Sequence, residues 1–591
     1  MSGVAQRLEM VRNLMREHRV DAWIVNGSDP HVSEYVAPRW NTRSWLSGFT
    51  GSAGTIVVTL DKALLWVDSR YYIQGAQQIA GTPFELMKLD APSVPDHVQW
   101  LASNIPANGV VGIDGLTMTV SATKALASTL SKKGIALKYT EDWFDSIWKD
   151  RPAVPYGSVN QMDSAVAGFS AEAKLQKIRQ SCNELGCTHT IVSSLDDIAW
   201  ILNMRGSDIP YNPVFLGYLL IGGQDAVLFT NPDRFTAQLQ ADLSQYVVVR
   251  EYHDVHQYLG SAFSETDVVY YSPDKTTVRI QESIPASIAL VEGRDISTTL
   301  KARKSPVEIE GMRRAHVLDG IAMVKLLAKV SRNSETYNEL TIAELLVACR
   351  KEHEEYLGPS FSPIAGFGAH GALAHYSATV NSSAVLEGNN LLVLDTGGQY
   401  KTGTTDITRT LLFGEATEQM RKDYTLVLKG NLSLAAQRFP AGTNGYQLDV
   451  LARQFLWQTG YNYGHGTGHG LGFCLNVHEG PQNISTKPIA VPLEVGMVIS
   501  DEPGVYREGL HGVRIENLVV VQHAGTTEFG EFLAFDVLTL CPFERRLIDT
   551  NLLTEAERQM VDAYHGWVYS ELLDKLSQDD AAWLREATLP L

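Results

Sequence analysis

The stretch that decides the fold lies between Asn462 and Asn517. It reads Asn-Tyr-Gly-His-Gly-Thr-Gly-His-Gly at 462–470, Val-His-Glu-Gly-Pro at 477–481, Ser-Asp-Glu-Pro-Gly at 500–504 and Gly-Val-Arg-Ile-Glu-Asn at 512–517. Its chemical side chains are three histidines and two prominent carboxylates: His465, His469, His478, Glu502 and Glu516. Imidazoles and carboxylates set among glycines indicate a metal site built from strands and tight turns.

A partner segment lies upstream of this stretch. It reads Leu-Leu-Val-Leu-Asp-Thr-Gly-Gly-Gln-Tyr at 391–400 and Gly-Thr-Thr-Asp-Ile-Thr-Arg-Thr at 403–410, which adds Asp395 and Asp406. Their spacing fits two adjacent antiparallel strands joined by a short turn at 400–403, with both carboxylates on one side. Either aspartate alone is more simply interpreted as a turn cap, but the pair favours a shared site.

Glu502 and Glu516 are expected to repeat this geometry. Residues 497–500 are an apolar strand that ends before Glu502, and residues 513–516 are predicted to be the strand that returns beside it. Asp501 is the weaker ligand candidate, because side chains alternate along a strand and it would face away from Glu502.

Four carboxylates gathered around the imidazole of His469 would carry too much negative charge to lie together unpaired. Two divalent cations would compensate this charge. The donor set is hard and rich in oxygen, which favours Mn²⁺, with Co²⁺, Zn²⁺ and Fe²⁺ as alternatives.

The 591-residue chain is too long for one ordinary domain. A charged helix, an apolar strand, a short tryptophan-containing segment and a strand pair occur in this order twice, which indicates an internal duplication of one α/β domain. The alternative is two unrelated α/β segments. We predict domains at 1–150, 160–298 and 299–591, and the last carries every chemical motif and has a C-terminal extension from about residue 533.

Composition restricts the class of protein. The net charge of −18 and the lack of basic runs argue against a nucleic-acid partner or an anionic membrane surface. Five scattered cysteines suit a reducing compartment, and no apolar leader or span is present, so we predict a cytoplasmic protein. No P-loop, HExxH or GxSxG motif occurs, and the glycine-rich run at 464–472 misses the GxGxxG spacing of a dinucleotide-binding site.

Together these segments resemble the M24 ("pita-bread") metallopeptidase family, in particular the long three-domain cytosolic aminopeptidase P (Xaa-Pro aminopeptidase) form. The resemblance covers nearly the whole chain and includes Ser-Gly-Phe-Thr-Gly-Ser-Ala-Gly-Thr at 47–55. It implies an α/β protein with two creatinase-like (ribonuclease-H-like) domains followed by a pita-bread α+β catalytic domain. It also implies a homodimer.

The resemblance also implies a role for each site residue. Asp395 would bind one metal ion, Asp406 and Glu516 would bridge two ions, and His469 and Glu502 would complete the other. Three further histidines, His375, His465 and His478, would line the substrate site and hold the peptide carbonyl or move protons. Arg514 and Tyr506 look like partners that orient ligating carboxylates.

The sequence departs from the family pattern at two places. Residues 367–371 read Phe-Gly-Ala-His-Gly where Gly-Pro-Asn-Gly is common, so His370 lies close to His375 and could be confused with it. Asp395 is followed by Thr-Gly-Gly where Ser-Gly-Ala is common. All five implied ligands remain in place.

The implied reaction is release of an N-terminal residue from short peptides with proline second. Two cations sharing a water would lower its pKa and generate hydroxide, with Glu502 moving the proton to the proline nitrogen. One alternative is a prolidase restricted to Xaa-Pro dipeptides. Others are a metal-free pita-bread binding module and a creatinase-type hydrolase without metal, both of which the five ligands weigh against.

Overall fold

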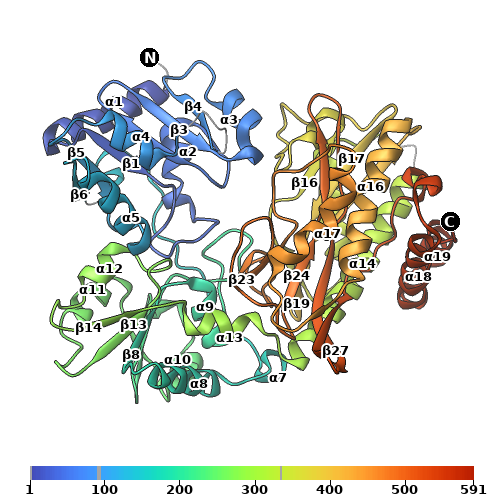
Figure 1. Ribbon diagram of the computed structural model, residues 1–591. Helices are drawn as coiled ribbons and strands as arrows, with labels where there is room; N and C mark the ends of the chain where they lie inside the picture. The colour runs from blue at the N-terminus through green and yellow to red at the C-terminus, as the bar shows by residue number, and fades with distance from the viewer. Residues whose placement is uncertain (1–2, 90–94, 141, 333–335) are drawn as a thin grey trace. The chain divides into compact units, whose positions relative to one another are not determined.

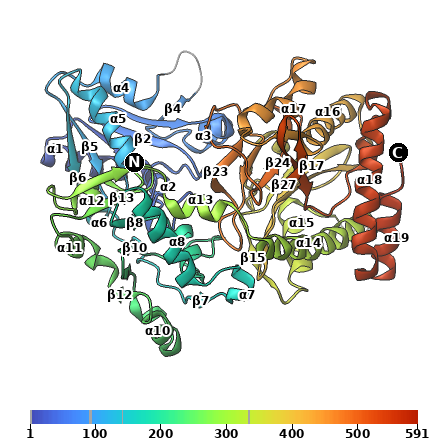
Figure 2. The ribbon, with the colours of Figure 1, turned by 60° about the horizontal axis from the view of Figure 1, so that its bottom comes forward.

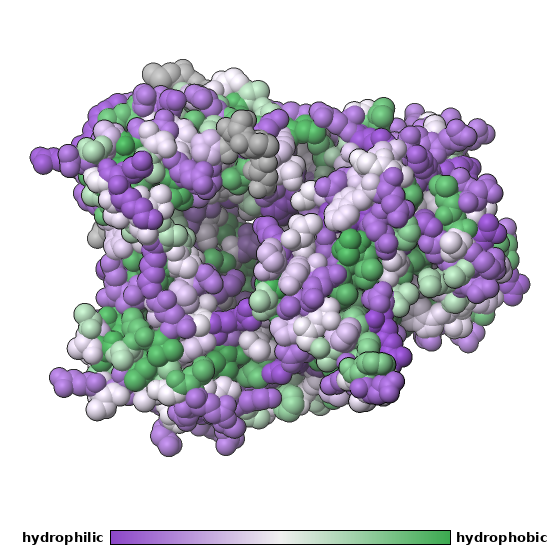
Figure 3. Space-filling view, in the orientation of Figure 1, coloured by the Kyte–Doolittle hydropathy of each residue, from purple (hydrophilic) through white to green (hydrophobic). Residues whose placement is uncertain are grey.

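The computed structural model describes residues 3–89, 95–140, 142–332 and 336–591 (Figure 1). The chain forms two compact units, Met1–Ser164 with Phe169–Thr299, and Ala165–Gly168 with Leu300–Leu591. The three-domain division at 1–150, 160–298 and 299–591 stays a prediction. Among the described helices, none is long and apolar enough to cross a membrane. Figure 3 shows hydrophilic residues on one face, interspersed with smaller hydrophobic patches.

The first unit contains a six-stranded sheet in the order β4-β3-β2-β1-β5-β6. The three central strands β1, β2 and β3 are antiparallel, and β4, β5 and β6 are added in parallel. The strands are β1 (Ala22–Val25), β2 (Thr55–Thr59), β3 (Ala63–Val67), β4 (Glu85–Lys88), β5 (Val110–Asp114) and β6 (Ala136–Thr140).

Helices cover both faces of this sheet because its strands are apolar on both sides. Trp23 packs with Leu8 and Met15 of α1 (Gly3–His18), whereas Ile24 packs with Leu101 of α4 (His97–Asn104) and Leu126 of α5 (Val120–Ser131). Successive residues of a strand point to opposite faces, so one strand contributes to two cores.

A second six-stranded sheet follows, in the order β12-β11-β10-β8-β13-β14. Its strands have the same chain order and the same parallel and antiparallel pairings as those of the first sheet. They are β8 (His189–Val192), β10 (Tyr218–Ile221), β11 (Ala226–Phe229), β12 (Val248–Arg250), β13 (Val268–Tyr271) and β14 (Ala289–Glu292), and α8 (Ala171–Glu184) leads into them. The predicted duplication is therefore confirmed.

Two sheets of the second unit, one of three strands and one of six, carry the site. One has the order β16-β17-β20, and the other β21-β28-β27-β24-β22-β23. The strands that bear on the site are β16 (Ile364–Phe367), β17 (Asn390–Thr396), β20 (Ile407–Phe413), β22 (Gly468–Gly470), β23 (Glu479–Ile484), β24 (Val498–Asp501) and β27 (Asn517–Thr527). The remaining strands of the six-stranded sheet are β21 (Arg438–Pro440) and β28 (Gly530–Val537). Two antiparallel hairpins, β18 (Gly398–Tyr400) with β19 (Gly403–Thr404) and β25 (Gly504–Arg507) with β26 (His511–Arg514), interrupt these strands.

The larger helices of this unit pack on these sheets or on one another. They are α14 (Pro306–Arg332), α15 (Glu339–Arg350), α16 (Glu418–Ala435), α17 (Gly445–Trp457), α18 (Glu555–Leu572) and α19 (Gln578–Ala587). Figure 2 shows α18 and α19 side by side near α14, and Val568 and Leu584 share a core cluster with Val324 of α14. This α+β unit, together with the two duplicated α/β sheets, confirms the predicted fold class.

A close backbone crossing joins β26 to the short helix η5 (Gly368–Ala372). A Cβ atom on Gly512 would lie 1.8 Å from the carbonyl oxygen of Gly371, so this position has no space for a side chain. The crossing ties the segment after β16 to the strand that ends at Arg514.

We predict that Gly512→Ala destabilises the protein by about 1–3 kcal/mol, as overpacking of a core does. The measurement is the melting temperature. Gly566→Ala, at an exposed helical glycine with open space around it, is the control and should leave stability unchanged or raise it. Equal melting of Gly512→Ala and the unmodified protein would contradict this reading of the crossing.

Candidate active site

Asp395 and Asp406 meet where β17 and β20 pair. Asp395 lies opposite Thr408 in the antiparallel register, and Asp406 immediately precedes β20. Both carboxylates are buried. The predicted pair of antiparallel strands is present, with the β18–β19 hairpin as its connection.

The strand that returns beside the one before Glu502 is not the predicted segment 513–516 but β27. Residues 511–514 form β26, which pairs with β25, whereas β24 pairs with β27 through Asp501 opposite Asn517. The prediction was wrong because Pro503 and Gly504 begin an extra hairpin. Glu502 and Glu516 nevertheless flank the same residue pair, one after β24 and the other before β27.

His469 reaches the carboxylates because its neighbours are glycines. A Cβ on Gly468 would lie 1.9 Å from the Ser500 carbonyl oxygen, and one on Gly470 would lie 2.2 Å from that of Glu479. The histidine Nδ1 lies 3.1 Å from the Gly470 carbonyl oxygen, which can only accept, so Nδ1 carries hydrogen. Nε2 then faces Asp406 Oδ2 at 3.5 Å and Glu502 Oε1 at 3.6 Å.

Three carboxylates each present one buried oxygen without a hydrogen-bond partner. These atoms are Asp395 Oδ1, Asp406 Oδ1 and Glu516 Oε1. In two of them the other oxygen is anchored: Arg514 donates to Asp395 Oδ2 at 2.6 Å, and Thr408 donates to Glu516 Oε2 at 2.8 Å. Ligand atoms of Asp406, His469 and Glu516 lie within 4.8 Å of one another. Buried acceptors that lack donors fit a bound cation.

The pKa shifts of these side chains also fit a bound cation. Burial, together with neighbouring carboxylates, raises the pKa of Glu502 to about 7 and raises the pKa values of Asp395 and Glu516. The pKa of His469 is raised to about 9 by hydrogen bonding to Asp406 and by the charge of Glu502, against the effect of burial. A cluster that takes up protons in this way would instead hold metal ions when they are available.

A chain of hydrogen bonds leads from Asp395 to His465. Arg514 donates through Nη1 to the Tyr506 hydroxyl at 2.7 Å, and this hydroxyl lies 2.8 Å from His465 Nε2. His465 Nδ1 lies 2.7 Å from the Gly466 carbonyl oxygen, so Nε2 is the acceptor. The structure thus connects both predicted orienting residues to a ligand candidate and to one of the three histidines.

The other two histidines differ in how they are placed. The ring centroids of His478 and His469 lie 4.2 Å apart, with an angle of 69° between the ring planes. His375 lies after η5, half-buried, next to Tyr376. Asp501, the weaker ligand candidate, is fully buried, and burial raises its pKa strongly.

Several residues that support the site were missed from the sequence. Thr408 holds Glu516, and Ser500 donates to Glu502 Oε1 at 3.2 Å while accepting from the His469 amide at 2.9 Å. Arg453 donates to the carbonyl oxygens of Tyr463 and His465, both at 2.7 Å, and so shapes the glycine-rich loop. The alternation of threonines at 404–410 was a signal for Thr408, whereas nothing marked Arg453 as buried.

The comparisons with known proteins cover the whole chain. Residues 310–523 match metallopeptidase family M24 and 531–591 its C-terminal region, while 7–147 and 150–308 each match a creatinase/prolidase N-terminal domain. A probable Xaa-Pro aminopeptidase P of Aspergillus flavus is 37% identical over 100% of this chain and 93% of its own length. One from Aspergillus niger is 38% identical over 99% of each chain.

Solved structures agree with this assignment. The X-prolyl aminopeptidase of Caenorhabditis elegans, described as a cytosolic enzyme with a di-nuclear active site, superposes with a TM-score of 0.96 at 31% identity, over 100% of both chains. The Xaa-Pro dipeptidase of Bacillus anthracis covers 64% of this chain and 99% of its own, with a TM-score of 0.52 at 25% identity. By sequence and by fold, this chain belongs to the Xaa-Pro aminopeptidase P group of metallopeptidase family M24.

Proposed function

We propose that the protein is a metal-dependent aminopeptidase that hydrolyses the bond between an N-terminal residue and a following proline in short peptides. The observation that carries the proposal is the buried cluster of carboxylate oxygens without donors around His469, in a chain similar over its full length to Xaa-Pro aminopeptidases.

The proposed metal site uses five residues. Asp395 would hold one divalent ion, Asp406 and Glu516 would bridge two, and His469 and Glu502 would complete the second. The relative from Caenorhabditis elegans is described as having a di-nuclear active site, which supports two ions per chain. Bound ions would supply an activated water and a Lewis acid. We propose Mn²⁺, because oxygen-rich donor sets suit it, while Co²⁺, Zn²⁺ or Fe²⁺ could take the same donors.

The protein's own groups supply the rest of the chemistry. Glu502 is proposed to take a proton from the attacking water at Oε1 and to pass it to the proline nitrogen, which needs a proton to leave. Ser500 holds this oxygen at 3.2 Å. His375, His465 and His478 are proposed to bind the peptide carbonyl or move protons, and the Tyr506 hydroxyl orients His465.

Substrate choice follows from the chemistry of proline. An Xaa-Pro bond has no N–H, so a site that depends on this donor fails and a site with a pocket for the ring succeeds. The prolidase alternative is weaker, because the Bacillus anthracis dipeptidase aligns with 64% of this chain whereas the aminopeptidases align with all of it. A binding module without metal is disfavoured by the five ligand candidates.

Location and assembly are also proposals. We propose a cytoplasmic enzyme, in agreement with the relative described as cytosolic, and a homodimer. Its partners would be short peptides with proline second. The charge of −18 disfavours binding to nucleic acid or to an anionic membrane surface.

The function is tested by stripping the metal, restoring Mn²⁺ and following Arg-Pro-Pro beside Ala-Pro and a proline-free peptide. We expect release of arginine from Arg-Pro-Pro only when metal is present, with the other two peptides nearly intact. Cleavage of Ala-Pro alone would identify a prolidase. A folded protein that cleaves none of the peptides with any of the four metals would refute the proposal.

A second prediction concerns Thr408. Thr408→Val removes the hydroxyl that donates to Glu516 Oε2 and lies 3.3 Å from Arg514 Nε, with little change in shape. Metal affinity should fall by about 10- to 100-fold, as is common when a partner of a ligand is lost. Competition with a fluorescent chelator measures it. Thr526→Val, at an exposed position of β27, is the control, and equal affinities in both variants would count against the role of Thr408.

A further inference from the structure

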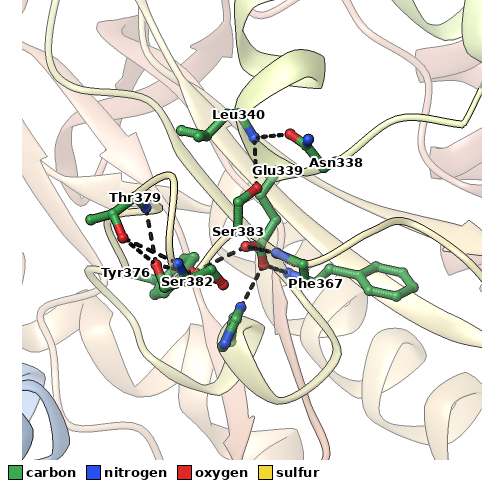
Figure 4. Close-up of polar contacts among 10 residues, drawn as sticks. Asn338, Glu339, Leu340, Phe367, Tyr376, Thr379, Ser382 and Ser383 are labelled. Atoms are coloured by element: carbon green, nitrogen blue, oxygen red, sulfur yellow. Dashed lines mark hydrogen bonds and ion pairs between the residues drawn. The ribbon is translucent and has the colours of Figure 1, made fainter.

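Glu339, the first residue of α15, has a fully buried carboxylate that accepts four hydrogen bonds (Figure 4). Oε1 accepts from the Phe367 amide at 2.7 Å and from His370 Nδ1 at 2.8 Å. Oε2 accepts from the Tyr376 hydroxyl at 3.0 Å and from the Ala384 amide at 2.8 Å. Both oxygens are therefore saturated, which distinguishes this carboxylate from those around His469.

The four donors belong to one segment, residues 367–384, which we call the histidine loop because it contains His375. Phe367 lies at its start and Ala384 at its end, so one side chain holds both ends and two points between them. A buried carboxylate is costly without such bonds. The loop and the carboxylate consequently depend on each other.

Inside the histidine loop, the residues that bond to Glu339 make further contacts with one another and with their neighbours. The rings of His370 and Tyr376 stack with centroids 4.4 Å apart. The Tyr376 hydroxyl also lies 3.1 Å from Ser382 Oγ, which accepts from the Thr379 amide at 3.0 Å. Figure 4 shows Tyr376, Thr379 and Ser382 grouped beside Glu339. The bonds to Glu339 thus fix Tyr376, and His375 is its immediate neighbour in the chain.

The opposite side of the histidine loop rests on the metal-site framework. Gly371 crosses Gly512 of β26 without space for a side chain. Two residues further along, Arg514 donates to Asp395 and to the Tyr506 hydroxyl. The loop is therefore held between Glu339 and the strand that orients a ligand candidate, and this sets where His375 lies relative to the carboxylate cluster.

We infer that Glu339 is a positioning residue for His375: its carboxylate holds the histidine loop so that the His375 side chain meets the substrate. The inference rests on the proposed function, in which His375 contacts the peptide. The hydrogen bonds of the Glu339 carboxylate go to the histidine loop and to none of the five ligand candidates, so it acts through the loop.

Glu339→Gln is the first test. The amide keeps the shape but turns one acceptor into a donor that faces two hydrogen donors, so at least one backbone N–H loses its partner. We expect kcat/KM on Arg-Pro-Pro to fall at least tenfold while the metal content stays that of the unmodified protein. Hydrogen exchange should rise in peptides from 367–384 but not in those from 390–413. Glu344→Gln, an exposed carboxylate on the same helix, should change none of these.

A double-mutant cycle with His375→Ala separates positioning from general destabilisation. If Glu339 acts through His375, the tenfold loss disappears when Glu339→Gln is added to His375→Ala. Full additivity of the two losses, or loss of metal in Glu339→Gln, would overturn the inference. If Glu339→Gln does not fold, Tyr376→Phe enters the same cycle with the same criteria.

The exchange measurement is independent of activity. If the unmodified protein cleaves no peptide, the proposed function fails, and exchange then decides whether Glu339 holds the histidine loop. Unchanged exchange at 367–384 in the variant would overturn the inference in that case as well.

Discussion

The arrangement of the second unit depends on the crowding of buried carboxylates around His469. Asp395, Asp406 and Glu516 each leave an oxygen without a donor, and burial raises the pKa values of Asp395 and Glu516. In an apolar interior such a cluster is unfavourable unless protons or cations compensate it. Because metal ligands must be deprotonated, binding of divalent cations would displace these protons. Such a cluster suits divalent ions, and the rest of the unit holds the carboxylates close together.

Two features of the fold hold the carboxylates in place: glycines at close backbone crossings and buried arginines. Glycines allow backbones to approach so closely that His469 enters between β23 and β24, and Gly512 does the same beneath the histidine loop. Buried arginines then satisfy carbonyl groups where strands end. Arg409 donates to the Glu516 carbonyl oxygen at 2.7 Å, to that of Cys541 at 2.7 Å and to the Tyr564 hydroxyl at 2.9 Å. The C-terminal segment that carries Tyr564 therefore helps to support the backbone beside the carboxylate cluster.

Much of the candidate site could be predicted from the sequence, because short-range sequence patterns specify the strands that carry its residues. The eleven-residue spacing of Asp395 and Asp406 predicted antiparallel strands that the structure contains. The prediction that residues 513–516 pair with the strand before Glu502 was wrong, because Pro503 and Gly504 begin a separate hairpin. The capping box at Thr554 and Glu557 predicts a helix through Tyr564, followed by a second helix to about Leu576. Its start is confirmed, but α18 continues to Leu572. Glu339 and Arg409 were missed because their partners lie far away in the chain, and only the fold brings these partners together.

The central claim is that these five side chains hold two divalent ions, with Asp406 and Glu516 shared between them. Anomalous diffraction from crystals grown with Mn²⁺, recorded on both sides of the manganese absorption edge, tests it most directly. The account predicts two peaks per chain, both bonded to Asp406 and Glu516, one also to Asp395 and the other also to His469 and Glu502. A single peak, or peaks bonded to other residues, would contradict it.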